Sequence, residues 1–573
     1  MLPAGALALL GAALAFSAAA AVERGRERLL GGDPEAAEAA FVHARRWPGT
    51  ARRAAAGLAL ARARGGRLSG ESPALADLNE FAPAAVVEAA LDMEDLTAAR
   101  ALAELLVRAR HPLGELYAGA VALERGHEEE ARRLATASRA PLASRAVGRR
   151  LAEALELGVL GTGAVVRDRR GALVGWLDGE GLLTLADGLD PLLLPPFQET
   201  PSRRRAEPEA TEGIPFWLPP AGAREARGAG GLRLTLDLDL ARLAREALGR
   251  WRGTIVLLEP RTGAILAAVS DPRTIAREGP AALTQRREPA SISKVLTAAA
   301  AYRAGIDADA AIGRMTCKGV ERYGGQPLWC SWKAGPLDGL DHALAISCNT
   351  SFATLGNRVG RDALTAELHR WGFDAGTDAL MGAAGRIHTP PKSARQLADL
   401  SIGLTVSDIT PLHAALLATV VANGGTMPEP RLVANVCGPV GLTDRLAILP
   451  PVREVADPRT VSRLLRAMKA VALYGTGSGL APSRFPIAMK TGTAAEYRKG
   501  YHVNYIGIAP TPDASLAFCV RITYRPNSRA VNRAAREVTQ TLLARLADRR
   551  LVLVGGAEEQ RGLAAWATGG GER

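Results

Sequence analysis

Lysine is used sparingly in this sequence, and one lysine stands where its amine could act as a base. Arginine supplies nearly all of the 71 basic residues. Arginine keeps its proton in proteins, whereas a lysine amine shielded from water can give it up. Lys294 follows Ser291 by three residues in a run that predicts a helix over 291–302, so both side chains would lie on one face. The amine could then take the proton of the serine hydroxyl and make it a nucleophile.

The Ser-x-x-Lys spacing alone is weak evidence, because Ser and Lys occur three apart by chance on many solvent-exposed helices. Two further motifs support it. A Ser-x-Asn motif at 347–349 follows the helical run 340–346, and a Lys-Thr-Gly-Thr motif at 490–493 ends an apolar run with the pattern of a strand. The order Ser-x-x-Lys, Ser-x-Asn, Lys-Thr-Gly is the signature of serine penicillin-binding proteins and β-lactamases. Residues 232 to about 550 resemble the transpeptidase domain of penicillin-binding proteins.

The resemblance implies a catalytic role for five residues. Ser291 would attack the D-Ala-D-Ala carbonyl of a peptidoglycan stem peptide and form an acyl-enzyme, with Lys294 as its base. Ser347 would pass a proton to the leaving amine. Asn349 would bind the substrate amide and Lys294, and Lys490 would add a positive field.

The resemblance also implies a substrate-binding strand. The hydroxyls of Thr491 and Thr493 would hold the terminal carboxylate, and the backbone N–H groups of Ser291 and Thr493 would form the oxyanion hole. Gly492 suits such a strand, because a substrate-binding edge needs close backbone approach.

The sequence around the motifs predicts the fold of this domain. Two apolar runs joined by the turn 261–263 predict a strand pair, and three strand-like runs follow at 485–493, 504–510 and 515–524. A helix at 528–550 closes the domain. Strands at both ends with helices between them predict an antiparallel sheet covered by helices, and the resemblance implies five strands in this α/β domain.

The chain as a whole predicts a multidomain protein with five parts. We expect a transmembrane anchor or signal segment at 1–22, an all-helical region at 33–157, a small β module with a Pro-rich linker at 158–230, the transpeptidase domain at 231–556 and a flexible tail at 557–573. The segment 163–175 loosely resembles the pedestal region of the monofunctional class B proteins. The helical region is unusual for that class, so the subclass stays open.

The helical region has apolar residues at helical spacing. Asp33, Pro34 and Glu35 predict a helix start, as N-cap, first-turn proline and first-turn acid. Gly or Pro residues recur between its helical runs, a pattern typical of tetratricopeptide-like hairpins, which would bind a protein partner. An Ala-rich bundle that spaces the next domain from the membrane is an equal alternative.

The first 22 residues indicate export. Residues 2–22 carry no charge and are long enough to cross a bilayer, while the small residues 18–21 also suit a cleaved signal peptide. Arg24, Arg26 and Arg28 follow the segment, and the positive-inside bias taken alone would place the next domain in the cytoplasm. We give more weight to the peptidoglycan chemistry that the resemblance implies, because its substrate lies outside the cytoplasm. We expect a single-pass protein of the cytoplasmic membrane with its catalytic domain on the outer, periplasmic side.

Composition excludes other classes. With 47% hydrophobic residues in 573, the chain is neither disordered nor collagen-like. The net charge of +12 is spread along the sequence, and aromatic residues make up only 4%, so we expect no nucleic-acid partner.

The five cysteines have different expected environments. In an exported protein Cys317 and Cys330 favour a disulfide, whereas Cys348 would be a small side chain packed behind the site. Cys437 and Cys519 would lie in the core. The histidines show no ligand spacing, so we expect no metal and no cofactor.

These observations favour a penicillin-sensitive D,D-transpeptidase that acts on peptidoglycan stem peptides and is acylated by β-lactams. A β-lactamase or D,D-carboxypeptidase would share the acylation step. A β-lactam sensor would usually carry several membrane spans and a His-Glu-x-x-His motif, and the sequence has neither. A catalytically silent scaffold that recruits partners through its helices is the remaining alternative.

Overall fold

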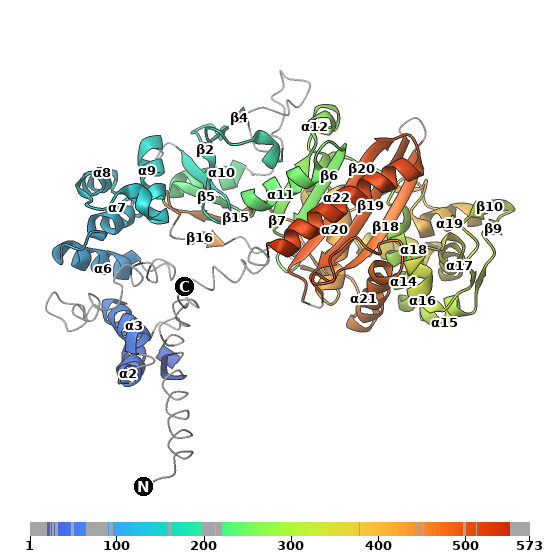
Figure 1. The fold of residues 1–573 in the computed structure, drawn as a ribbon, viewed down its shortest axis with the longest axis horizontal. Coiled ribbons are helices and arrows are strands. Elements are labelled where there is room, and N and C mark those ends of the chain that lie inside the picture. The colour runs from blue at the N-terminus through green and yellow to red at the C-terminus, as the bar shows by residue number, and fades with distance from the viewer. Residues whose placement is uncertain are drawn as a thin grey trace, which may run out of the picture.

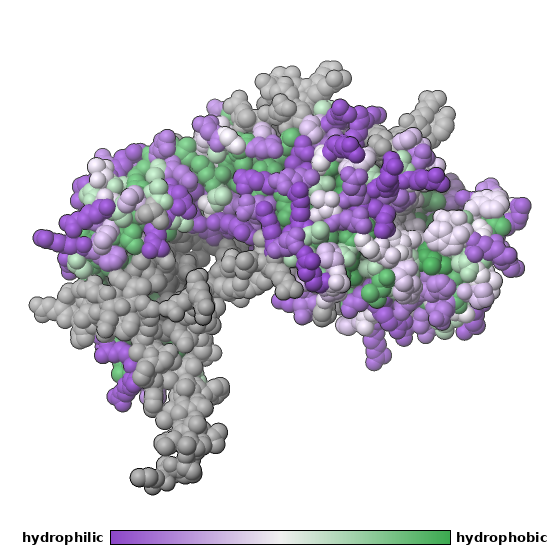
Figure 2. Space-filling model, viewed as in Figure 1, coloured by the Kyte–Doolittle hydropathy of each residue, from purple (hydrophilic) through white to green (hydrophobic). Residues whose placement is uncertain are grey.

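A computed structural model gives the structure of residues 20–22, 24–25, 28, 33–46, 51–64, 87, 90, 96–158, 163–195, 212–213, 220–376, 379–441, 444–447, 452–496, 500–511 and 513–549. Helices α6 to α9, a seven-stranded sheet and a five-stranded sheet follow one another along the longest axis (Figure 1). Hydrophilic side chains are spread over both ends of the molecule on the face shown in Figure 2, in agreement with the mixed distribution of charge along the sequence.

The described residues of the N-terminal part are mostly helical. Its helices are α2 (Pro34–Arg45), α3 (Ala51–Arg64), α6 (Leu96–Arg108), α7 (Gly114–Glu124), α8 (Glu128–Ala137) and α9 (Ala146–Leu157). The predicted helix start is confirmed, because the Asp33 carboxylate accepts the backbone N–H of Ala36 at 3.0 Å. Helix α2 packs against α3, and α7 packs against α6, α8 and α9. The tetratricopeptide-like repeat stays a prediction.

The predicted membrane segment at 1–22 lies, except for residues 20–22, outside the described residues. Within the described ranges no helix is long and apolar enough to span a bilayer. The predicted tail at 557–573 also lies outside them.

The small β module expected after residue 158 contains two consecutive hairpins. Strands β1 (Ala164–Arg167), β2 (Leu173–Leu177) and β3 (Leu183–Leu185) pair antiparallel. The Asp168 carboxylate accepts the N–H groups of Arg170 and Ala172 in the first turn, and Gly171 there has a φ of 85°, which glycine adopts easily.

The sheet of this module extends across the expected boundary at 230–231. Its strand order is β16-β15-β5-β1-β2-β3-β4, with β4 (Glu212–Gly213), β5 (Gly231–Leu234), β15 (Val433–Cys437) and β16 (Asp444–Ala447). β5 pairs parallel with β1 and antiparallel with β15. Segments on both sides of the boundary therefore share one ladder of backbone hydrogen bonds, and 158–230 does not form the module alone.

The large domain contains the predicted five-stranded antiparallel sheet. Its order is β18 (Ala488–Glu496), β19 (Gly500–Ala509), β20 (Leu516–Arg525), β6 (Gly253–Leu258) and β7 (Ile265–Ser270). Helices α11 (Leu238–Leu248) and α22 (Ser528–Asp548) pack side by side on it. Helix α20 (Pro411–Ala422) also covers β19 and β20 without packing against α22, so the sheet lies between α20 and α22.

A second layer of short elements completes the domain beside the edge strand β18. Four helices matter for the site: α14 (Ser293–Arg303), α16 (Gly339–Ala345), α17 (Asn349–Val359) and α21 (Pro458–Leu473). Elsewhere along the described chain, the helices and strands not yet named are α10 (Pro220–Ala229), α12 (Pro272–Glu278), α13 (Ala281–Thr284), α15 (Ala308–Gly313), α18 (Arg361–Arg370), α19 (Ala394–Ile402), β8 (Thr316–Cys317), β9 (Val320–Tyr323), β10 (Gln326–Trp329), β11 (Gly335–Pro336), β12 (Arg386–Ile387), β13 (Ser407–Asp408), β14 (Thr426–Pro428) and β17 (Val452–Glu454). The 3₁₀ turns are η1 (Leu142–Ser144) in the helical region, η2 (Pro191–Leu193) after β3, and η3 (Ala290–Ile292) and η4 (Ala379–Gly382) in the large domain.

Candidate active site

Ser291 and Lys294 lie together at the start of α14, as their spacing predicts. Ser291 belongs to the 3₁₀ turn η3, which leads directly into the helix. Lys294 Nζ is 2.9 Å from Ser291 Oγ, and the lysine is 0% exposed. The preceding Ala290 has a φ of 56°, an uncommon conformation for a residue with a side chain, and its N–H donates to Gly403 O at 2.7 Å. The turn Ala290–Ile292 that carries the predicted nucleophile, or nucleophile turn, is thus held by the end of α19.

The Lys294 amine is surrounded by oxygens. Besides Ser291 Oγ it contacts the Ser347 carbonyl at 2.7 Å, Ser347 Oγ at 3.1 Å and Asn349 Oδ1 at 2.7 Å. Burial removes the water that would stabilise an ammonium ion, and it lowers the pKa of Lys294 from 10.5 to about 8. A substantial fraction of this amine is therefore neutral near pH 8.

The Ser-x-Asn motif occupies the joint between α16 and α17. Ser347 has a φ of 56°, and the next residue, Cys348, donates its N–H back to Ala343 O at 2.9 Å. This left-handed step ends α16 and lets α17 begin at Asn349. The Asn349 amide donates to Trp329 O at 2.8 Å while its Oδ1 faces Lys294, so the side chain is fixed at both ends.

Lys490, on strand β18, contacts the Ser347 hydroxyl from the other side of the site. Its Nζ is 2.9 Å from Ser347 Oγ and 2.6 Å from Thr491 O, and the side chain is 0% exposed. Burial and the neighbouring Lys294 hold the pKa of Lys490 well below its usual range. The Ser347 hydroxyl therefore bridges two buried amines.

The strand that carries Lys490 is the free edge of the five-stranded sheet. A Cβ on Gly492 would lie 3.1 Å from both Ser291 N and Pro289 O, tighter than ordinary van der Waals contact, so glycine lets the strand lie close to the turn that carries Ser291. Thr491 Oγ1 contacts Thr476 Oγ1 at 2.6 Å. The site thus has a polar strand on one side and the nucleophile turn on the other.

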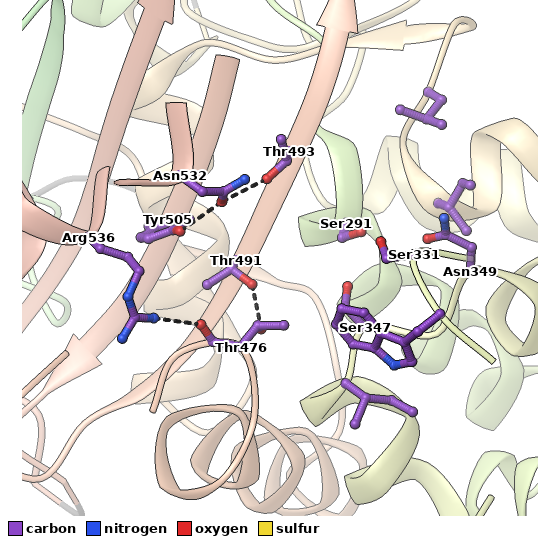
Figure 3. A pocket seen from close by; sticks show the side chains of 14 residues that line it. Ser291, Ser331, Ser347, Asn349, Thr476, Thr491, Thr493, Tyr505, Asn532 and Arg536 are labelled. Atoms are coloured by element: carbon purple, nitrogen blue, oxygen red, sulfur yellow. Dashed lines mark hydrogen bonds between the residues drawn. The ribbon is translucent and has the colours of Figure 1, made fainter. Parts of the chain in front are cut away.

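A cleft of about 350 Å³ opens between these walls. In Figure 3, Ser291, Ser331, Ser347 and Asn349 face Thr476, Thr491, Thr493, Tyr505, Asn532 and Arg536 across it. The structure brings every predicted catalytic and substrate-binding residue to this cleft or to the buried layer under it.

Several cleft residues were missed by the sequence analysis. Asn532 Oδ1 accepts the hydroxyls of Thr493 at 3.1 Å and Tyr505 at 3.0 Å. Arg536, one helical turn further along α22, donates to the carbonyls of Thr476 at 3.2 Å and Ser478 at 2.7 Å. The four-residue spacing puts Asn532 and Arg536 on one face of α22, but nothing in the sequence says that this face meets the motif strand.

The expected disulfide between Cys317 and Cys330 is wrong, because both residues are free thiols. Cys330 instead lies beside the start of α17, with its Sγ 3.7 Å from that of Cys348 and accepting the N–H of Asn349 at 3.2 Å. The expected export of the protein and the loop between the two cysteines suggested a pair, whereas the fold brings a third cysteine to the same place. Cys437 and Cys519 are buried, as expected.

Comparison with known proteins identifies the family of the large domain. Residues 253–544 match the family model described as penicillin binding protein transpeptidase domain. The peptidoglycan D,D-transpeptidase PbpA of Mycolicibacterium smegmatis is 31% identical over 340 residues, which cover 52% of this chain and 68% of the relative.

Solved structures show the same fold. A D,D-transpeptidase domain of a peptidoglycan glycosyltransferase from Eggerthella lenta aligns over 68% of this chain and 99% of that one, with a TM-score of 0.55 and 21% identity. The ceftriaxone acyl-enzyme complex of penicillin-binding protein A from M. tuberculosis aligns over 68% and 100%, with a TM-score of 0.53 and 24% identity. The chain belongs to the penicillin-binding protein transpeptidase family and is class B-like.

Proposed function

We propose that this protein is a peptidoglycan D,D-transpeptidase that cross-links stem peptides through an acyl-enzyme on Ser291. The observation that carries the proposal is the 2.9 Å contact between Ser291 Oγ and a fully buried Lys294 amine, whose pKa burial lowers to about 8. A neutral amine at that distance is the activating base that a serine nucleophile needs. The PbpA relative, by its name, performs this reaction.

Acylation begins with proton transfer from Ser291 Oγ to Lys294 Nζ as the oxygen attacks the carbonyl of the penultimate D-Ala. The backbone N–H groups of Ser291 and Thr493 stabilise the oxyanion, a contribution of about 3 kcal/mol for each donor. The close approach of Gly492 to Ser291 N supports this pairing, because it holds the strand against the nucleophile turn.

Expulsion of the terminal D-Ala requires a proton on its amine. Ser347 Oγ lies within 3.1 Å of Lys294 Nζ and 2.9 Å of Lys490 Nζ, so it can deliver a proton and take one back from either lysine. The amine of a second stem peptide then attacks the acyl-enzyme, and the cross-link forms as Ser291 is released. Attack by water instead gives a carboxypeptidase.

The substrate carboxylate would bind the hydroxyls of Thr491 and Thr493. A negative charge at this point favours the protonated form of Lys490, so substrate binding would supply the positive field that burial suppresses in the empty cleft. Arg536, also in the cleft wall, adds a permanent positive charge.

Slow hydrolysis is the outcome that the cleft supports. Among the described residues that line it, none is Asp or Glu, so no carboxylate stands ready to activate a water molecule. Intact mass measured after a penicillin pulse separates the alternatives: an adduct that persists for minutes supports a transpeptidase, and rapid loss indicates a β-lactamase.

We also propose that the protein is held at the cytoplasmic membrane by residues 1–22, with the cleft on the outer side. The uncharged run at 2–22 supports this placement. Fluorescent-penicillin labelling of membrane and soluble fractions tests it, because a soluble labelled protein of full length would exclude a retained anchor.

The decisive test of the chemistry is labelling with a fluorescent penicillin. We expect one label on the wild type and none on Ser291→Ala. Ser407→Ala is the matched control, because that serine lies outside the cleft and its buried hydroxyl has no hydrogen-bond partner. Equal labelling of the wild type and Ser291→Ala would refute the proposal.

A further inference from the structure

Three cysteines from separate segments gather under the Ser-x-Asn motif. Cys317 ends β8, Cys330 directly follows β10, and Cys348 directly precedes α17. Their sulfur atoms all lie within 4.8 Å of one another. In the described part of the chain, no other three residues of the metal-ligating types form such a group.

The spacing of the sulfurs suits a metal ion better than a disulfide. Zinc–sulfur bonds of about 2.3 Å at tetrahedral angles place two thiolates about 3.8 Å apart. The sulfurs of Cys330 and Cys348 are 3.7 Å apart, and the other two edges are at most 4.8 Å, so closing the triangle takes about 1 Å. A disulfide would have to bring two sulfurs to about 2.05 Å and would leave the third unpaired.

The three sulfurs form one face of a tetrahedron, and the Thr350 hydroxyl occupies its fourth corner. Thr350 Oγ1 is 3.5 Å from the sulfurs of Cys330 and Cys348 and 3.7 Å from that of Cys317. A zinc ion with bonds of about 2.3 Å to sulfur and about 2.0 Å to oxygen requires sulfur–oxygen separations of about 3.5 Å.

Two backbone N–H groups favour a negative charge on Cys330, although its hydrogen bond with Cys348 and its burial raise the pKa of this thiol. The backbone N–H groups of Asn349 and Thr350, at the start of α17, donate to Cys330 Sγ at 3.2 and 3.3 Å. The positive end of this 11-residue helix therefore points at the cluster. Cys317 and Cys348 are 2% and 3% exposed, whereas Cys330 is partly exposed and leaves a route for an ion.

We propose that Cys317, Cys330 and Cys348 form a binding site for a thiophilic d¹⁰ cation, with Zn²⁺ as the ion and the Thr350 hydroxyl as its fourth ligand. Each thiol that binds releases its proton to solvent. The ion would tie β8 and β10 to the first turn of α17. It would stabilise the segment that carries Asn349, although it takes no part in the acyl transfer itself.

Zinc titration of the reduced, metal-free full chain against a chromogenic chelator tests the site. We expect one Zn²⁺ per chain, a higher unfolding temperature on loading, and sulfur-to-metal charge-transfer absorption when Co²⁺ replaces Zn²⁺. Cys317→Ser should weaken binding at least about tenfold, because it removes one thiolate of three. Cys519→Ser is the matched control, since this buried cysteine lies in β20, outside the cluster, and its variant should bind like the wild type.

Two results would overturn the proposal: reduced wild type that binds no zinc while all three thiols react with a thiol reagent, or unchanged affinity in Cys317→Ser. If that variant does not fold, the Co²⁺ spectrum of the wild type decides, since absence of the charge-transfer band excludes thiolate ligation. Fluorescent-penicillin labelling is a separate measurement, so failure of the zinc site and failure of the transpeptidase proposal are distinguishable.

Discussion

At the scale of single residues, burial rather than the number of hydrogen bonds decides which form of Lys294 the site favours. Four oxygens surround its Nζ: Ser291 Oγ, the Ser347 carbonyl and hydroxyl, and Asn349 Oδ1. An ammonium has three protons to donate, so it cannot satisfy all four at once. A neutral amine donates two protons and accepts one from a serine hydroxyl. Either form therefore satisfies three of the four oxygens, and it is burial that favours the neutral base able to accept the proton of Ser291.

This protonation state predicts how acylation depends on pH. The neutral base is required and its pKa is about 8, so the second-order rate of acylation by a chromogenic cephalosporin should fall about tenfold per pH unit well below pH 8 and level off above it. Lys294→Arg should lose at least about 100-fold at every pH, because arginine keeps its proton. Stopped-flow traces check both. A flat profile between pH 6 and 9 would assign the base to another group.

At the scale of elements, the sequence predicts best what is local. The Asp33 cap and the five strands of the large sheet follow from short patterns. The motif residues follow from the resemblance to penicillin-binding proteins, and only the spacing of Ser291 and Lys294 predicts a contact by itself. Pairings between distant segments carry no such signal. Strand β15, about 200 residues after β5, joins the small sheet through backbone hydrogen bonds that any sequence could make. Asn532 and Arg536 were missed for the same reason, because they reach the cleft through the packing of α22 against a distant strand.

The contact between β18 and the nucleophile turn predicts a strong effect of one methyl group. In Gly492→Ala the new Cβ would lie 3.1 Å from Ser291 N, so the strand and the turn must separate by a few tenths of an ångström. We expect penicillin acylation to fall at least about tenfold, because oxyanion donors act only at short range. Gly228→Ala is the control, since a Cβ there meets nothing within 4 Å. Equal acylation rates for Gly492→Ala and the wild type would show that the turn moves freely.

At the scale of the whole molecule, buried charges join the helical region to the small sheet. Arg167 in β1 is 1% exposed and pairs with Glu153 of α9 at 2.5 Å. Glu124 of α7 is 0% exposed, and its carboxylate accepts the N–H of Val440 at 3.0 Å in the loop after β15. The loop passes so close to the Glu124 carboxylate that a Cβ on Gly438 would overlap the carboxylate oxygens. Because β15 is part of a chain segment that returns to the large domain, this contact connects all three parts.

Loss of the Glu124 carboxylate should therefore loosen the junction and leave the chemistry intact. Glu124→Ala leaves the buried N–H of Val440 without this partner, which costs about 1–3 kcal/mol. We expect a lower unfolding temperature and faster proteolysis between the helical region and the small sheet, with an acylation rate within about twofold of wild type, since the cleft lies in the large domain. Glu129→Ala, on the exposed surface of the next helix, should change neither property. Unaltered unfolding and proteolysis in Glu124→Ala would mean that the helices are held by their apolar contacts alone.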